Sequence, residues 1–138
     1  MDRVKTSVIS ILLGLAFAYL SIAIIGYAAA IPISEQVLKP LMQLSSTFAF
    51  ALINFFTSGI PLAIVYCFFA VILNFLYAGH FKLKFSLLAL PFFLLHFGLL
   101  VISSHENLFT LLVNIPQYIT VFLAVLWVQK SKLIGNKA

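Results

Sequence analysis

Charged residues divide the chain into long apolar stretches, and this pattern predicts the fold class before any motif is considered. The charge-free stretches are residues 6–34, 40–81, 85–105 and 107–129. A membrane-spanning helix needs about 20 apolar residues, so the first, third and fourth stretches each fit one span. The second stretch is too long for one span and marginal for two.

The second stretch contains the sequence Thr-Ser-Gly-Ile-Pro at residues 57–61, where glycine and proline are expected to interrupt a helix. After it, residues 61–79 form a full predicted span. Before it, residues 35–58 are amphipathic as far as Thr47, because polar residues recur at helical spacing opposite leucines and phenylalanines. Such a segment is expected to lie in the membrane interface or to enter the membrane as a re-entrant helix.

The prediction that results is an all-α integral membrane protein with a single membrane domain, residues 1–138. It is a bundle of four transmembrane helices with one additional amphipathic or re-entrant helix. The predicted spans are about residues 7–31, 61–79, 85–103 and 108–128, and the amphipathic or re-entrant segment is about residues 35–58.

Composition supports the membrane assignment. Hydrophobic residues make up 64% of the chain and charged residues only 8%, whereas a soluble domain carries roughly 25% charged residues. This balance excludes a soluble enzyme, a nucleic-acid binder and a disordered chain, because too little polar surface is left to face water. Cys67 is the single cysteine, so an intramolecular disulfide is excluded.

The distribution of Lys and Arg predicts the orientation, because these residues are enriched in cytoplasmic segments. Four spans with the N-terminus inside place seven of the eight Lys and Arg in the cytoplasm and leave only Lys39 outside. Five spans with the N-terminus outside give six inside and two outside. Arg3 and Lys5 flank the first span and favour four spans. We expect a bacterial inner (cytoplasmic) membrane protein with N- and C-termini in the cytoplasm.

His96 is the one ionisable side chain deep inside a predicted span, and such residues are functional candidates. At 1.5 Å per residue it lies about 11 Å below the outer surface, while Asn114 and Gln117 of the antiparallel last span lie at roughly 9 and 13 Å. The three side chains are therefore expected to share one depth. They form either a polar, proton-responsive binding site or a structural contact, with a neutral histidine bonded to an amide across two helices.

Proline lies next to these polar groups in both spans. One face of the last span carries a polar stripe, Thr110, Asn114, Gln117 and Thr120. Pro116 lies within that stripe and frees the carbonyl of Leu112, and Pro91 does the same for Leu87 in the preceding span. Interrupted helices beside polar groups are typical of midplane binding sites in transporters, although prolines are also common in ordinary membrane helices.

Two further groups are candidates for packing or binding. Ser10, Gly14 and Ala18 place small residues at every fourth position of the first span, which allows close approach of another helix from this chain or from a partner. Asn74 is an amide within the second span and is a candidate binding residue. Its alternative role is a hydrogen bond that joins two helices.

The sequence gives no reason to expect catalysis, a metal site or a cofactor. The three acids all lie outside the apolar stretches: Asp2, Glu35 and Glu106. This removes carboxylate pairs and carboxylate–metal sites from the membrane interior. A bis-histidine haem site is not expected either, because His80 and His105 lie at opposite membrane faces and His96 has no second histidine at its depth.

The pair Asn74-Phe75, which closes a span before a basic loop, is loosely similar to the GtrA-like group. That group is associated with the movement of lipid-linked sugars across membranes. The aromatic-rich signature expected after the pair is missing, since the sequence reads Leu-Tyr-Ala-Gly-His-Phe-Lys. We therefore assign no family on this similarity.

Two functional hypotheses follow. The first is a small non-enzymatic inner-membrane protein that binds another membrane protein, as an accessory subunit or an immunity-type protein. It rests on the missing catalytic set and the abundant close-packing faces. The alternative is a small oligomeric transporter or flippase with a polar site around His96, Asn114 and Gln117. It requires self-association, because four spans are too few to enclose a wide pathway. The expected partners are the lipid bilayer and either a membrane protein or further copies, and not nucleic acid.

Overall fold

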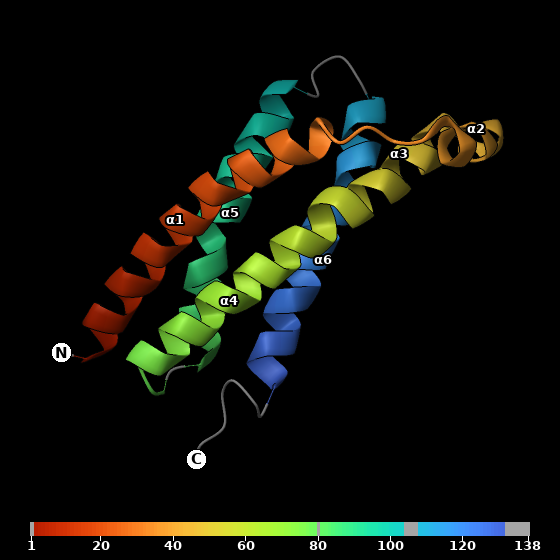
Figure 1. Cartoon of the computed structure of the whole chain (residues 1–138). Coiled ribbons are helices and arrows are strands. Elements are labelled where there is room, and N and C mark those ends of the chain that lie inside the picture. Colours follow the sequence, from red (N-terminus) through yellow and green to blue (C-terminus); the bar gives the residue numbers. More distant parts are fainter. Residues whose placement is uncertain (1, 80, 104–107, 132–138) are drawn as a thin grey trace.

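The computed structural model describes residues 2–79, 81–103 and 108–131, which form helices and short connections without any strand. The helices are α1 (Asp2–Ala29), α2 (Glu35–Leu44), α3 (Ser46–Asn54), α4 (Ile60–Leu76), α5 (Phe81–Ser103) and α6 (Leu108–Lys130), and a π-helical turn, Phe55–Gly59, joins α3 to α4 (Figure 1). Four helical segments are long and apolar enough to cross a membrane, and α2 is an additional helix. The predicted fold class is confirmed.

The second membrane-spanning segment differs from the one expected at residues 61–79. The structure forms one helical run over Ser46–Leu76, of 31 residues. The amphipathic helix is correspondingly shorter than the predicted 35–58, since α2 ends at Leu44 and a cap at Ser45 separates it from α3. A helix of this length measures about 46 Å, which exceeds the apolar thickness of a bilayer and favours a tilted span.

The helical run continues because the expected break at residues 57–61 is absorbed by the π-helical turn. The backbone N–H of Ile60 donates to the carbonyl of Phe55, five residues earlier. This wider turn shifts the hydrogen-bonding pattern by one residue just before Pro61, which has no N–H to donate. A glycine and a proline therefore alter the helix locally without ending it.

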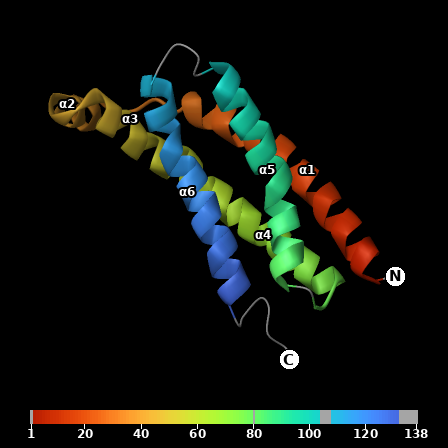
Figure 2. The same ribbon diagram turned by 180° about the vertical axis from the view of Figure 1, so that it is seen from behind.

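The four long helices are arranged so that α1 begins and α6 ends at the same end of the bundle (Figures 1 and 2). The loop between α4 and α5 also lies at this end. The helix ends at this side carry most of the positive charge, including Arg3, Lys5, Lys82 and Lys130. Glu106, Lys132 and Lys137, which contributed to the predicted orientation, and His80 and His105 lie outside the described residues.

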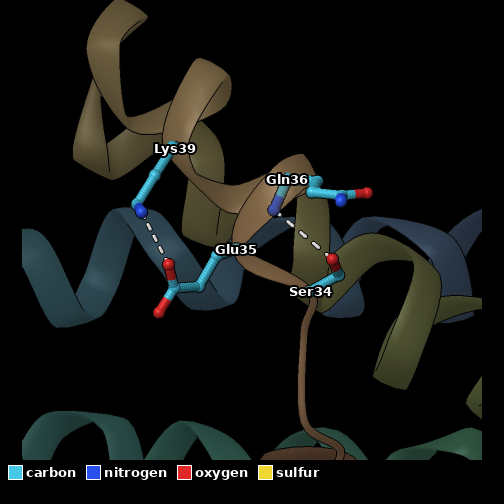
Figure 3. A network of polar contacts seen from close by, with 4 residues as sticks. All are labelled: Ser34, Glu35, Gln36 and Lys39. Carbon is cyan, nitrogen blue, oxygen red and sulfur yellow. Dashed lines mark hydrogen bonds and ion pairs between the residues drawn. The ribbon is translucent and has the colours of Figure 1, made fainter.

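At the opposite end, α2 extends beyond α6 in both views (Figures 1 and 2). It packs on α3, and none of its residues is buried. The Ser34 hydroxyl oxygen caps the helix by accepting from the backbone N–H of Gln36 at 3.3 Å, and Lys39 pairs with Glu35 at 2.6 Å (Figure 3). Both charged side chains are exposed, so the pair contributes only about 0.3–0.5 kcal/mol.

The core of the bundle is aromatic. Phe17 of α1 is fully buried and lies 5.7 Å from Tyr66 of α4 and 5.2 Å from Phe92 of α5, measured between ring centroids. The Tyr66 hydroxyl donates to the carbonyl of Phe85 at 2.9 Å, which satisfies the one polar atom of that ring. These contacts hold α1, α4 and α5 together near the middle of the bundle, between the basic helix ends and the polar groups around His96.

Candidate functional site

A partly open cavity of about 210 Å³ lies between α1, α5 and α6. Its lining residues are Ile22, Ile25, His96, Leu99, Leu100, Asn114, Gln117 and Tyr118. They belong to the last third of α1 and α5 and to the first half of α6, so the cavity lies toward the end of the bundle opposite the basic helix ends. The structure therefore brings His96, Asn114 and Gln117 to one cavity.

A chain of hydrogen bonds runs along α6 into this cavity. The Asn114 Nδ2 donates to the carbonyl of Thr110 at 2.7 Å, and the Gln117 Nε2 donates to Asn114 Oδ1 at 3.3 Å. Asn54 of α3 joins the chain, because its Nδ2 donates to the carbonyl of Val113 at 3.1 Å and approaches Asn114 Oδ1 at 3.5 Å. Asn54 falls in the segment 35–58 that was predicted to be interfacial or re-entrant, and the structure places it in α3, which packs on α6 inside the bundle.

The end of this chain is unsatisfied. Gln117 is 2% exposed, and its Oε1 is a buried acceptor without a hydrogen-bond partner in the described part of the chain. An unpaired buried polar atom costs about 1–3 kcal/mol, and such atoms are rare in folded proteins. Because Gln117 lines the cavity, a group bound there can supply the missing donor.

His96 is held by α1 instead of by an amide. Its Nε2 lies 2.6 Å from the hydroxyl oxygen of Ser21, and the same hydroxyl lies 2.6 Å from the carbonyl of Ala18. The imidazole is buried against Phe92, with ring centroids 4.5 Å apart. Ser21 was missed from the sequence, although it continues the row of small residues that begins at Ser10.

Two of the three helices that line the cavity, α5 and α6, carry a proline near it. Pro91 of α5 lies five residues before His96, and Pro116 of α6 directly precedes Gln117. The π-helical turn packs on the same part of α6, since a Cβ added to Gly59 would lie 2.8 Å from the Thr120 hydroxyl and 3.4 Å from the Gln117 Cα. Two prolines and a π-helical turn therefore lie close to the polar groups, while α5 and α6 each continue as one helix.

The small residues of α1 pack inside the bundle. Ser10, Gly14 and Ala18 are all buried, and a Cβ on Gly14 would lie 2.6 Å from the Leu88 carbonyl oxygen and 2.9 Å from the Pro91 ring. This face of α1 therefore meets α5 of the same chain and is not available to another protein.

Asn74 lies at the other end of the bundle, away from the cavity. Its Oδ1 accepts from Lys84 Nζ at 2.7 Å, and the same Nζ donates to the carbonyl of Tyr77 at 2.6 Å. Lys84, which belongs to the basic segment after the second predicted span, is fully buried. The ammonium group instead joins the end of α4 to the start of α5.

The polar lining of the cavity consists of two amides, an imidazole and a phenol, which bind hydrogen-bonding groups. Among the described residues, no group of three or more His, Cys, Asp or Glu side chains is placed to hold a metal ion. We therefore assign no metal or cofactor to the site.

Comparison with protein-family models, curated proteins and solved structures finds no match for this chain. The similarity of the Asn74-Phe75 pair to the GtrA-like group accordingly supports no family assignment.

Proposed function

We propose that this chain is a small, non-enzymatic transporter or flippase that binds a membrane-dissolved molecule in the cavity between α1, α5 and α6. The observation that carries the proposal is the buried, unpaired Oε1 of Gln117, a residue that lines the cavity. A bound molecule that donates a hydrogen bond to this atom removes the penalty of about 1–3 kcal/mol for leaving it unpaired. The cavity is concave and small, which suits a ligand group better than a whole helix.

The two prolines beside the cavity and the nearby π-helical turn support a transporter over a static binding protein. Transporters commonly place their binding sites where membrane helices are interrupted, because freed backbone groups and altered packing allow movement there. Pro91 and Pro116 each remove one hydrogen bond from a helix that otherwise continues, and the π-helical turn shifts the hydrogen-bonding pattern by one residue. π-Helical turns are also frequent at functional sites.

We also propose how the chain is oriented in the membrane and that it acts as an oligomer. With the basic helix ends in the cytoplasm of a bacterial cell, the cavity opens in the outer half of the inner membrane and both termini are cytoplasmic. A pathway across the membrane needs more wall than four spans provide, so the active form is an oligomer. The outward faces of the helices expose many large apolar side chains to lipid or to another copy.

The test is the native mass of the protein taken from its own membrane into nanodiscs. We expect a homo-oligomer that retains a small molecule, and we expect Gln117→Leu and His96→Leu to lose that molecule while they still insert. Gln129→Leu is the matched control, because it makes the same change on α6 at the other end of the bundle, where Gln129 bonds the Lys82 carbonyl and Ser86. Equal retention by all variants contradicts the proposal.

A second candidate is the accessory or immunity-type protein, and α2 is the observation that favours it. This helix extends from the bundle, buries none of its residues and exposes apolar side chains such as Val37 and Leu44. The small-residue face of α1 no longer supports this candidate, because it packs on α5. A stoichiometric second protein in the native mass, lost in a Val37→Glu, Leu44→Glu variant, identifies this function in place of transport.

A further inference from the structure

We infer that the cavity recognises a neutral molecule through its hydroxyl groups, because Gln117 Oε1 and His96 Nδ1 are both hydrogen-bond acceptors. This inference rests on the proposed function and names the chemistry of the molecule that is bound. It follows from two chains of hydrogen bonds, each of which begins at a backbone carbonyl and ends at the cavity.

The first chain fixes the orientation of the Gln117 amide. A carbonyl oxygen only accepts, so the Asn114 group that lies 2.7 Å from the Thr110 carbonyl must be the donating NH₂. Asn114 then presents its Oδ1 to Gln117 and accepts from Nε2 at 3.3 Å. A flipped Gln117 amide would place two acceptor oxygens against each other. The Oε1 of Gln117 is therefore the group left without a partner.

The second chain fixes the tautomer of His96. Ser21 has one hydroxyl hydrogen, and its oxygen lies 2.6 Å from both the Ala18 carbonyl and His96 Nε2. The carbonyl cannot donate, so the hydroxyl hydrogen points to Ala18. His96 Nε2 must then carry the hydrogen that fills the contact with Ser21. In the neutral imidazole this leaves Nδ1 with a lone pair, and His96 lines the cavity.

Charge narrows the class of ligand. Among the described residues, no Asp, Glu, Lys or Arg side chain lines the cavity, and the imidazole of His96 is its one basic group. A bound ammonium group would lack a counter-ion, and a bound phosphate would meet two acceptors and no cation, which is costly inside a membrane. The Tyr118 hydroxyl both donates and accepts, so it adds no preference. A neutral hydroxyl group satisfies the acceptors without this penalty, whether it belongs to a lipid or to a free polyol.

The first experiment measures the tautomer in the unaltered chain. The protein, labelled with ¹⁵N-histidine, is placed in nanodiscs of phosphatidylcholine, a lipid without a hydrogen-bond donor. The chain has three histidines, and the His96 signal is assigned by its loss in His96→Phe. We expect Nε2 to be protonated and Nδ1 to be unprotonated. A protonated Nδ1 overturns the inference, and this measurement does not depend on the folding of Gln117→Leu.

The second experiment adds three probes: 1,2-dioleoylglycerol, its methyl ether, which lacks the hydroxyl, and glycerol. We expect a hydroxyl probe to move the Nδ1 signal of His96 and to raise the unfolding temperature. In the native mass measurement, the protein should retain roughly tenfold more dioleoylglycerol than its methyl ether, because one hydrogen bond supplies about this factor in affinity. Gln117→Leu should lose this preference, and Gln129→Leu should keep it.

The outcomes distinguish a lipid hydroxyl from a free polyol, and they distinguish failure of the hydroxyl inference from failure of the proposed transport function. A response to dioleoylglycerol alone identifies a lipid hydroxyl, and a response to glycerol alone identifies a free polyol. No response to either leaves water as the donor in the cavity and overturns the inference. If the ether binds as tightly as the alcohol and still depends on Gln117, the hydroxyl inference fails while the proposed function stands. A stoichiometric protein partner without a retained small molecule contradicts the proposed function.

Discussion

Gly14→Ala tests the closest contact between α1 and α5. An added Cβ would lie 2.6 Å from the Leu88 carbonyl oxygen and 2.9 Å from two atoms of the Pro91 ring. Ordinary contact begins at 3.4 Å, so the carbonyl must move by about 3.4 − 2.6 = 0.8 Å and the ring by about 3.4 − 2.9 = 0.5 Å. Neither obstacle is a flexible side chain, and the strain must be relieved by moving the helices apart.

The expected loss is worked from two opposing effects. Overpacking of a tight interface costs about 1–3 kcal/mol, and the upper end applies because backbone and a proline ring are the obstacles. Alanine is also favoured over glycine in a helix by about 1 kcal/mol. We expect Gly14→Ala to lower the free energy of unfolding by about 2 kcal/mol.

Gly26→Ala is the matched control on the same helix. No atom lies within 4 Å of its added Cβ, so only the helix-propensity gain remains. The difference between the two variants isolates the overpacking effect, about 3 kcal/mol. Reversible unfolding in mixed detergent micelles, followed by circular dichroism, measures both. If Gly14→Ala unfolds with the same free energy as Gly26→Ala, the α1–α5 packing described above is wrong.

Three further predictions address other parts of the bundle. Gly59→Ala should destabilise the protein by about 1–3 kcal/mol, since its Cβ would lie 2.8 Å from the Thr120 hydroxyl; Thr120→Ala should restore most of this loss in the same unfolding assay, and an additive double variant contradicts the contact. Lys84→Met should lower the free energy of unfolding by about 1.5–3 kcal/mol for each charged hydrogen bond lost, whereas Lys82→Met, on an exposed side chain, should change it little; equal effects of the two variants exclude the buried role of Lys84. Glu35→Cys in a cysteine-free background should react with a membrane-impermeant maleimide added outside intact cells, and labelling only after permeabilisation rules out the proposed orientation.

Much of the fold follows from the apolar pattern, because the requirement for about 20 apolar residues per span is a strong constraint. The boundary of the second span did not follow. Residues 57–61 contain the same glycine and proline whether the helix ends there or passes through a π-helical turn. Whether the helix ends or continues there depends on tertiary contacts, above all on the close approach of Gly59 to Thr120. The local sequence pattern does not contain this information.

The candidate site shows the same division. Helical rise alone predicted a common depth for His96, Asn114 and Gln117, and these residues do line one cavity. An amide partner for His96 was one of the two alternatives left open, and the partner is Ser21. The rotation of α1 about its axis, which spacing does not give, decides which small residue faces α5. Lys84 is buried and bonds Asn74 and the Tyr77 carbonyl. The sequence does not predict this contact, since a charge close to a helix end can reach either solvent or the carbonyls of a neighbouring helix end.

The hydrogen bonds of Lys84 are satisfied and those at the cavity are not, and the difference follows from the number of donors and acceptors in each cluster. At the basic end, an ammonium group, which only donates, meets Asn74 Oδ1 and the Tyr77 carbonyl, which only accept. In the cavity, each chain of hydrogen bonds starts at a backbone carbonyl. Each amide or hydroxyl then donates to the group before it and offers its oxygen as an acceptor to the group after it. A chain that begins with an acceptor therefore also ends with one, as at Gln117. Among the described residues, no donor meets this end, and this is why we propose that the cavity, and not the lysine contact, binds a molecule.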